Sequence, residues 1–221
     1  MPKRTIKPAF PENVQDLVER LGNVPLERIR LRPPPGTATE KDVLAAEREP
    51  RKRLCELIDG VLVEKPTGTR EALIASLLGY FLWEYVRPRG CGVVLGADGM
   101  LRIFPGRVRI PDVSFIASER LPKGELPDDA IAEIAPNLAV EILSRSNTGK
   151  EIELKLRDYF QSGAELAWVI QPKTRTADVY TSAEEKRHLS KNQSLDGGSV
   201  LPGFKLPLKT LFASPGRKHA S

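Results

Sequence analysis

The sequence predicts an α/β fold in which a mixed, central β-sheet is flanked by helices, with a helical extension before it. Two patterns indicate this fold. Residues 71–87 are apolar over most of the circumference of a helix, so this helix must pack against a sheet. Residues 138–143 are apolar on both faces of a strand except for one acid, which is typical of a covered central strand. The length of 221 residues suits one sizeable core and is short for two.

Three segments are expected along the chain. Residues 1–50 form the helical extension and a basic linker, residues 51–213 form the α/β domain, and residues 214–221 form a disordered basic tail. This division places all of the candidate site residues in one domain.

The extension contains two predicted helices. Residues 14–21 have the spacing of a short amphipathic helix, and Thr39 can cap a second helix over residues 40–49. The basic run at residues 48–53 follows. A solvated linker is the favoured interpretation of this run, and a contact to phosphate is the alternative.

The α/β domain begins with a predicted β-hairpin. Residues 54–58 and 61–64 are strand-like and flank Asp59-Gly60, a pair that favours a tight type I′ turn. The apolar helix over residues 71–87 follows. Trp83 in this helix is interpreted as a packing aromatic rather than as a base-stacking side chain.

Strand patterns and polar loops alternate over the rest of the domain. Residues 92–95, 100–104 and 108–116 predict an antiparallel meander, because short turn-forming segments separate them. A polar loop over about residues 118–136 precedes the central strand. The later elements, in chain order, are a helix over residues 150–161, a strand over 167–171, a hairpin from 177–180 and 188–195, and turns over 196–204.

Composition argues against several classes of protein. No apolar run approaches the roughly 20 residues of a membrane span, and no signal-like segment follows the first residues, so a cytoplasmic protein without membrane contact is expected. Cys55 and Cys91 lack zinc-ligand spacing and are expected to be buried free thiols. The histidines, His188 and His219, support no catalytic triad or histidine-rich metal site. The net charge of +5 is compatible with a polyanionic partner but has little weight alone.

Two acids, Asp112 and Glu141, lie where strand cores should be apolar. Burying an ionised carboxylate costs several kcal/mol, so each acid needs a cation. The alternation of side chains points Glu141 into a covered face, and Pro111 indicates an interrupted ladder beside Asp112. Two interpretations stay open: strand-end acids in structural hydrogen bonds, or two ligands of a hard cation such as Mg²⁺.

Lys155 lies at the border of the apolar stripe on the helix that follows the Glu141 strand. Its stem can run along the sheet while its ammonium reaches toward Glu141. The alternative is an ordinary helix-face ion pair with Glu151, four residues earlier.

Short motifs occur in a fixed order along the domain: Glu56-Leu57-Ile58-Asp59-Gly60, Pro111-Asp112-Val113, Val140-Glu141-Ile142-Leu143-Ser144, and Lys155 ahead of Tyr159 and Gly163. Trp168-Val169-Ile170 and Leu201-Pro202-Gly203-Phe204 are further landmarks. From about Leu54 to Phe212 the chain therefore resembles the Uma-type putative restriction endonuclease family of the PD-(D/E)XK nuclease superfamily. The superfamily pattern has a lysine where this chain has Leu143, and the family instead has a basic residue on the following helix, which Lys155 matches.

The resemblance implies a restriction-endonuclease-like fold and a set of site residues. It makes Asp112 and Glu141 ligands of Mg²⁺, or of Mn²⁺, with the backbone carbonyl of Ile142 as an additional oxygen, and it makes Lys155 the catalytic lysine. Two further acids are candidates for the site, Glu71 and Glu56. A helix N-terminus explains Glu71 equally well.

The expected function is that of a metal-dependent endonuclease, which hydrolyses DNA phosphodiester bonds and acts on DNA as a monomer or a homodimer. The alternative is a non-catalytic nuclease-fold module that binds nucleic acid or a protein partner. A metal-dependent hydrolase of a small phosphate ester is a third hypothesis, separated from the first by whether plasmid DNA is nicked.

Overall fold

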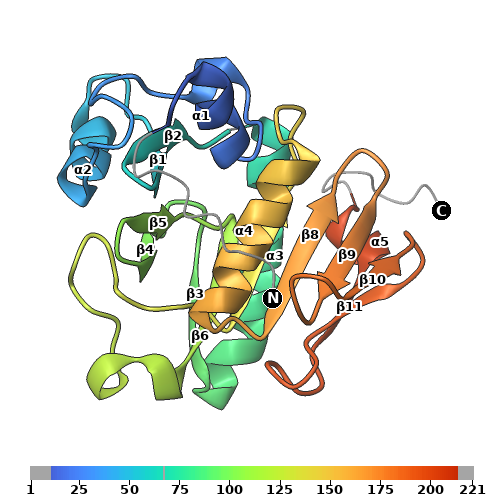
Figure 1. Cartoon of the computed structure of the whole chain (residues 1–221). Helices are drawn as coiled ribbons and strands as arrows, with labels where there is room; N and C mark the ends of the chain where they lie inside the picture. Colours follow the sequence, from blue (N-terminus) through green and yellow to red (C-terminus); the bar gives the residue numbers. More distant parts are fainter. Residues whose placement is uncertain (1–10, 67, 214–221) are drawn as a thin grey trace, which may run out of the picture.

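The computed structural model describes residues 11–66 and 68–213, and Figure 1 shows the arrangement of their elements. The strands form a four-stranded sheet, a six-stranded sheet and a separate two-stranded pair. The four-stranded sheet has the order β2 (Val61–Glu64), β1 (Cys55–Ile58), β5 (Arg107–Arg109), β4 (Leu101–Phe104). The six-stranded sheet has the order β10 (Lys186–Leu189), β9 (Thr176–Tyr180), β8 (Leu166–Gln171), β7 (Leu138–Ile142), β6 (Val113–Ala117), β3 (Gly92–Leu95). Helices cover the larger sheet on both faces, so the predicted mixed α/β fold is confirmed. The predicted tail, residues 214–221, lies outside the described residues.

The predicted N-terminal helices are confirmed as α1 (Val14–Arg20) and α2 (Glu40–Arg48), with the 3₁₀ turn η1 (Leu26–Arg28) between them. Thr39 caps α2 in a reciprocal capping box with Asp42. Both helices pack their apolar faces onto the smaller sheet. The domain boundary at residue 50 stays a prediction.

The predicted hairpin is confirmed as β1 (Cys55–Ile58) and β2 (Val61–Glu64). Its turn residues, Asp59 and Gly60, have φ values of 49° and 75°, as a type I′ turn requires. A Cβ atom on Gly60 would lie 2.4 Å from the backbone of Gly36, so glycine is required there for space as well as for conformation.

The predicted meander is wrong, because its strands belong to different sheets. The single strand predicted over residues 108–116 is β5 (Arg107–Arg109) in the smaller sheet and β6 (Val113–Ala117) in the larger one. In addition, β4 (Leu101–Phe104) pairs with β5, whereas β3 (Gly92–Leu95) pairs with β6. Pro111 has no N–H to donate to a ladder, so the chain leaves one sheet and enters the other at residues 110–112.

The central strand of the larger sheet is β7 (Leu138–Ile142), whose five residues are all buried as predicted. It pairs antiparallel with β6 and parallel with β8 (Leu166–Gln171). The next strands, β9 (Thr176–Tyr180) and β10 (Lys186–Leu189), extend the sheet as an antiparallel hairpin.

Two helices sandwich β7 and β8. The apolar side chains of α3 (Thr69–Val86) pack with Val140 and Trp168. Those of α4 (Gly149–Ser162) pack with Ala167 and Val169, which point to the opposite face.

The remaining elements are η2 (Arg87–Arg89), η3 (Ser118–Arg120), η4 (Pro122–Gly124), β11 (Ser194–Asp196), β12 (Lys205–Pro207) and α5 (Leu208–Leu211). The strand predicted over residues 188–195 is therefore divided between β10 and β11.

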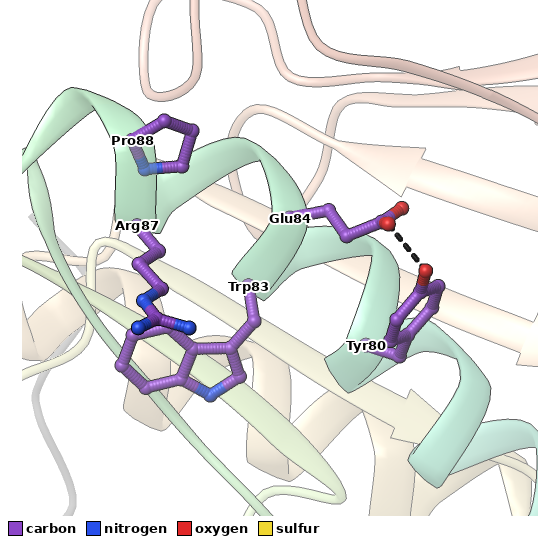
Figure 2. A pocket seen from close by; sticks show the side chains of 5 residues that line it. All are labelled: Tyr80, Trp83, Glu84, Arg87 and Pro88. Carbon is purple, nitrogen blue, oxygen red and sulfur yellow. Dashed lines mark hydrogen bonds between the residues drawn. The ribbon is translucent and has the colours of Figure 1, made fainter.

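Three other expectations concern single side chains and membrane spans. Cys55 is a buried free thiol as expected, and Cys91 is free but only half-buried. The packing role expected for Trp83 is wrong: the side chain is 41% exposed on the outer face of α3, beside Tyr80 and Arg87 (Figure 2). Among the helices of residues 11–66 and 68–213, none is long and apolar enough to cross a membrane.

Candidate active site

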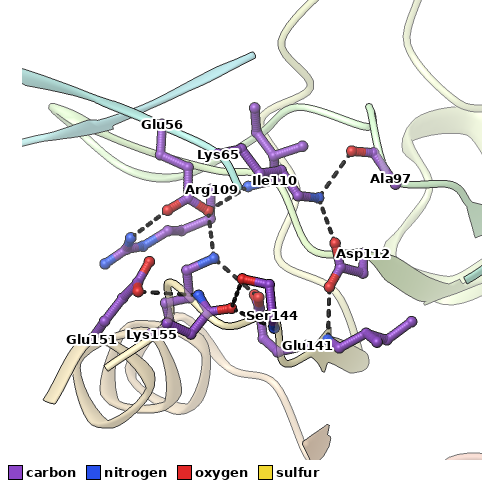
Figure 3. A network of polar contacts seen from close by, with 12 residues as sticks. Glu56, Lys65, Ala97, Arg109, Ile110, Asp112, Glu141, Ser144, Glu151 and Lys155 are labelled. Carbon is purple, nitrogen blue, oxygen red and sulfur yellow. Dashed lines mark hydrogen bonds and ion pairs between the residues drawn. The ribbon is translucent and has the colours of Figure 1, made fainter. Parts of the chain in front are cut away.

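The candidate site lies where the chain crosses between the two sheets and passes the end of β7 (Figure 3). The backbone N–H of Asp112 donates to the Val140 carbonyl over 2.9 Å. In return, the N–H of Ile142 donates to Asp112 Oδ2 over 2.6 Å. These two hydrogen bonds fix the Asp112 carboxylate against the carboxyl end of β7, although the crossing itself belongs to neither sheet.

Glu141 points from β7 toward α4, on the face that strand alternation predicts. Lys155 Nζ lies 3.0 Å from Glu141 Oε2, and the Tyr159 hydroxyl donates to Oε1. Burial raises the pKa of Glu141; the Lys155 charge opposes this shift, and the charges of Asp112 and Glu56 add to it. Burial is thus the main cause of the raised pKa, and each of the two Glu141 oxygens has a donor.

Glu56 brings a third acid to the site from β1 of the smaller sheet, and its side chain is only 2% exposed. Lys155 Nζ lies 3.0 Å from Glu56 Oε1, and Arg109 Nη1 donates to Oε2 over 2.7 Å. Burial alone would raise the pKa of Glu56, but the Lys155 and Arg109 charges and the Ile110 N–H lower it to about 2. Glu56 is thus ionised whenever the protein is folded near neutral pH.

Lys155 lies between Glu56 and Glu141 and is 1% exposed. Burial would lower the pKa of Lys155, but the two carboxylates raise it above its ordinary value. The alternative helix-face pair with Glu151 is wrong, because Glu151 accepts hydrogen bonds from Arg28 over 2.6 and 2.9 Å. Lys155 therefore reaches toward the Glu141 strand, as predicted.

Arg109 extends the network on the other side of Glu56. Its Nε donates to Asp158 Oδ2 over 2.8 Å, so the buried charges alternate in sign in the order Asp158, Arg109, Glu56, Lys155 and Glu141. A buried ion pair offsets its desolvation cost only when its geometry is good and its remaining hydrogen bonds are made. This chain of contacts meets that condition and ties α4 to both sheets.

Lys65 is the cation that contacts Asp112. Its Nζ lies 2.9 Å from Asp112 Oδ1 and donates to the Ala97 carbonyl over 2.9 Å. Both Lys65 and Asp112 line a cavity of about 530 Å³ beside the N-terminus of α3, which Glu71 also lines. Asp112 is therefore the acid of the pair that is accessible from this cavity.

The structure brings together most of the predicted site residues. Asp112, Glu141, Ile142 and Lys155 lie in one network of contacts, and Glu56 joins them. The carboxylate of Glu71 is folded against its own helix terminus instead: a Cβ atom on Gly68 would lie 2.0 Å from Glu71 Oε2. This position favours the helix-terminus interpretation of Glu71.

Sequence reasoning missed four polar residues of the network: Lys65, Arg109, Asp158 and Tyr159. Arg109 had a usable signal, because it is a charged residue in a strand-like run two positions before Pro111. Tyr159 was placed in the apolar stripe of its helix, where periodicity says nothing about its hydroxyl. Lys65 follows the hairpin, and only the packing of the two sheets brings it to Asp112.

Comparison with known proteins adds independent observations. Residues 40–209 match the model of a family described as Uma2, putative restriction endonuclease. The chain also resembles the crystal structure of a putative nuclease belonging to DUF820 from Anabaena variabilis ATCC 29413, with a TM-score of 0.64. The two are 22% identical, and the match covers 72% of this chain and 90% of that chain, so it concerns the fold. Comparison with the curated proteins gave no match.

Proposed function

The chain belongs to the Uma2 family of putative restriction endonucleases, and from this premise we propose that it is a metal-dependent endonuclease that hydrolyses phosphodiester bonds in DNA. One observation supports the proposal beyond the family: the N–H of Ile142, the residue that follows Glu141 in β7, donates to the Asp112 carboxylate, so both acids belong to the same end of this strand. Asp112 is also open to a cavity that can admit a substrate group. Family membership and fold support a nuclease, and the site chemistry supports the metal.

The oxygen donors at this position fit Mg²⁺ or Mn²⁺. An ionised carboxylate offers about four lone-pair sites, and the contacts described for Asp112 and for Glu141 use two on each. Among the described residues no cluster of three or more His, Cys, Asp or Glu is arranged to hold a metal. The proposed site therefore consists of the two carboxylates, the Ile142 carbonyl and water, and Mg²⁺ commonly keeps several waters and one or two carboxylates.

A divalent ion bound there would supply a water of lowered pKa and stabilise the negative charge of the reacting phosphate. The chain's own residues hold the ligands in place. Lys155 and Tyr159 fix the two oxygens of Glu141, and Glu56 in turn fixes Lys155. Because Lys155 is almost fully enclosed by these acids, we assign it a positioning role through Glu141. The other side of the site is fixed by the backbone of β7.

Substitution of the two ligands tests this proposal. We expect Asp112→Asn and Glu141→Gln each to lower the rate of Mg²⁺-dependent or Mn²⁺-dependent nicking of supercoiled plasmid by at least about 10²-fold, because each removes a ligand charge. Asp129→Asn, at an exposed loop position, is the matched control and should cut at the wild-type rate. Circular dichroism establishes that the variants are folded. Wild-type nicking by either ligand variant would contradict the proposal.

A second function is favoured by one observation: each site acid already contacts a protein cation. Lys65 contacts Asp112, and Lys155 contacts both Glu56 and Glu141. Such a network is stable without a metal and suits a module that binds nucleic acid or a protein without cutting. Titration of the protein with Mn²⁺ in a calorimeter separates the two functions. Carboxylate-dependent binding supports the nuclease, and its absence supports the module.

A further inference from the structure

The site contains a second lysine that the superfamily pattern does not include. We propose that Lys65, and not Lys155, is the lysine that contacts the phosphate group of the substrate. The inference rests on the proposed nuclease function and assigns the substrate-facing cation of the same site.

The lining of the cavity beside α3 distinguishes the two lysines. Lys65 and Asp112 line the cavity of about 530 Å³ together. Lys155 does not line it and is 1% exposed, with Glu56 on one side and Glu141 on the other. A phosphate that approaches Asp112 from the cavity therefore meets the ammonium of Lys65, whereas contact with Lys155 would require the buried carboxylates to separate.

The Lys65 ammonium is held in a position that suits this role. Its side chain is 4% exposed, and its Nζ is fixed by Asp112 Oδ1 and by the Ala97 carbonyl, each 2.9 Å away. An ammonium has three N–H donors, and these two contacts use two of them. The third can be donated to a ligand in the cavity. A cation held in place before the substrate arrives stabilises developing charge without further reorganisation.

The charge of the cavity leads to the same assignment. Its charged lining residues, within the described part of the chain, are Lys65, Glu71 and Asp112. A phosphodiester carries one negative charge and would otherwise face two carboxylates. Lys65 therefore supplies the cation that makes this side of the site compatible with a phosphate.

One consequence separates this role from a purely structural one. Lys65 is the counter-ion of Asp112 Oδ1, so it competes with any divalent ion for that oxygen. Its removal should strengthen metal binding while it weakens cleavage. A lysine that only holds Asp112 in place would weaken both when it is removed.

Lys65→Met tests the inference by two measurements on the full chain. We expect plasmid nicking to fall by about 10²-fold, as for the loss of one preorganised charge. We expect calorimetry to show Mn²⁺ affinity raised about fivefold, a coupling of ordinary size between two cations that share Asp112 Oδ1. Lys65→Gln keeps a hydrogen-bond donor for Asp112 and Ala97 without the charge, and it should give the same pair of changes if Lys65→Met fails to fold. Lys52→Met, at an exposed lysine paired with Glu47, is the control and should change neither quantity.

The outcomes are distinct. Folded Lys65 variants that cut at the wild-type rate, or that lose metal affinity together with cleavage, overturn the assignment of Lys65 and leave the proposed function standing. A wild-type protein that binds no Mn²⁺ and cuts no DNA overturns the proposed function, and this inference with it.

Discussion

Lys155 is the cation that compensates two of the buried carboxylates of the site. Its ammonium contacts carboxylates from two different sheets, Glu56 of β1 and Glu141 of β7. Without it, these two carboxylates, whose side chains are only 2% and 6% exposed, would lose the cation that they share. The same ammonium therefore stabilises the fold and positions Glu141, the proposed metal ligand.

Lys155→Met is expected to lower the free energy of unfolding by about 3–5 kcal/mol, because breaking a buried ion pair leaves an uncompensated charge. Urea denaturation followed by circular dichroism measures this change. Lys52→Met is the control for the loss of an exposed lysine and should stay within about 0.5 kcal/mol of the wild type. A loss below 1 kcal/mol for Lys155→Met would contradict the contacts described for the network.

Glu56 gives the stability of the protein a pH dependence. Its pKa is lowered from an ordinary value of 4.5 to about 2, so the unfolded chain binds this proton first as the pH falls. The resulting stability is fully present above about pH 4.5 and is lost as the pH falls toward 2. In Glu56→Gln the free energy of unfolding should rise less steeply with pH in this window, by up to about 1.4 kcal/mol per pH unit. Equal slopes for the wild type and the variant, measured by urea titration, would contradict the assignment.

At the scale of elements, the crossing from β5 to β6 determines the site. Residues 110–112 carry the chain from one sheet to the other, and they place Asp112 beside the end of β7. The hairpin of β1 and β2 contacts the same crossing: Glu56 of β1 accepts from the Ile110 N–H, and Lys65, directly after β2, contacts Asp112. The positions of Glu56 and Lys65 in the site therefore depend on the conformation of this hairpin.

The hairpin turn gives a prediction at this scale. Gly60→Ala should destabilise the protein by about 1 kcal/mol more than Gly106→Ala. Both glycines have positive φ, 75° and 73°, so both variants bear the conformational cost. At Gly60 the new Cβ atom would also collide with Gly36, whereas at Gly106 nothing described lies within 4 Å. Thermal unfolding of the two variants measures the difference. Equal melting temperatures would show that the contact with Gly36 relaxes freely.

Helices, strands and turns whose sequence signals lie within a few neighbouring residues could be predicted. The type I′ turn, the capped helix after Thr39 and the central strand around Glu141 all follow from local spacing. The pairing of β3 with β6 and of β4 with β5, in two different sheets, could not be predicted in this way. A strand-like run continues from residue 108 to 116, and nothing in its periodicity says that its two halves pair with different sheets.

At the scale of the whole molecule, the site is assembled from both sheets and one helix. Glu56 comes from the smaller sheet, Lys65 from the segment directly after its strand β2, Glu141 from the larger sheet and Lys155 from α4 (Figures 1 and 3). The approach of Lys155 to Glu141 could be predicted because only 14 residues separate them. The contacts of Lys65 and Arg109 depend on how the sheets pack, and local sequence carries no such information. DNA as the partner, and a homodimer, stay predictions.

The most direct test of the proposed metal site is a crystal of the full chain soaked in Mn²⁺ and measured by anomalous diffraction. We expect an anomalous peak bound by oxygens of both Asp112 and Glu141, at about 2.0–2.3 Å from each. We also expect Lys155 to keep its contact with Glu141 when the ion is present. A crystal without a peak between the two acids at saturating Mn²⁺, or with manganese bound only elsewhere in the molecule, would contradict the proposed metal site.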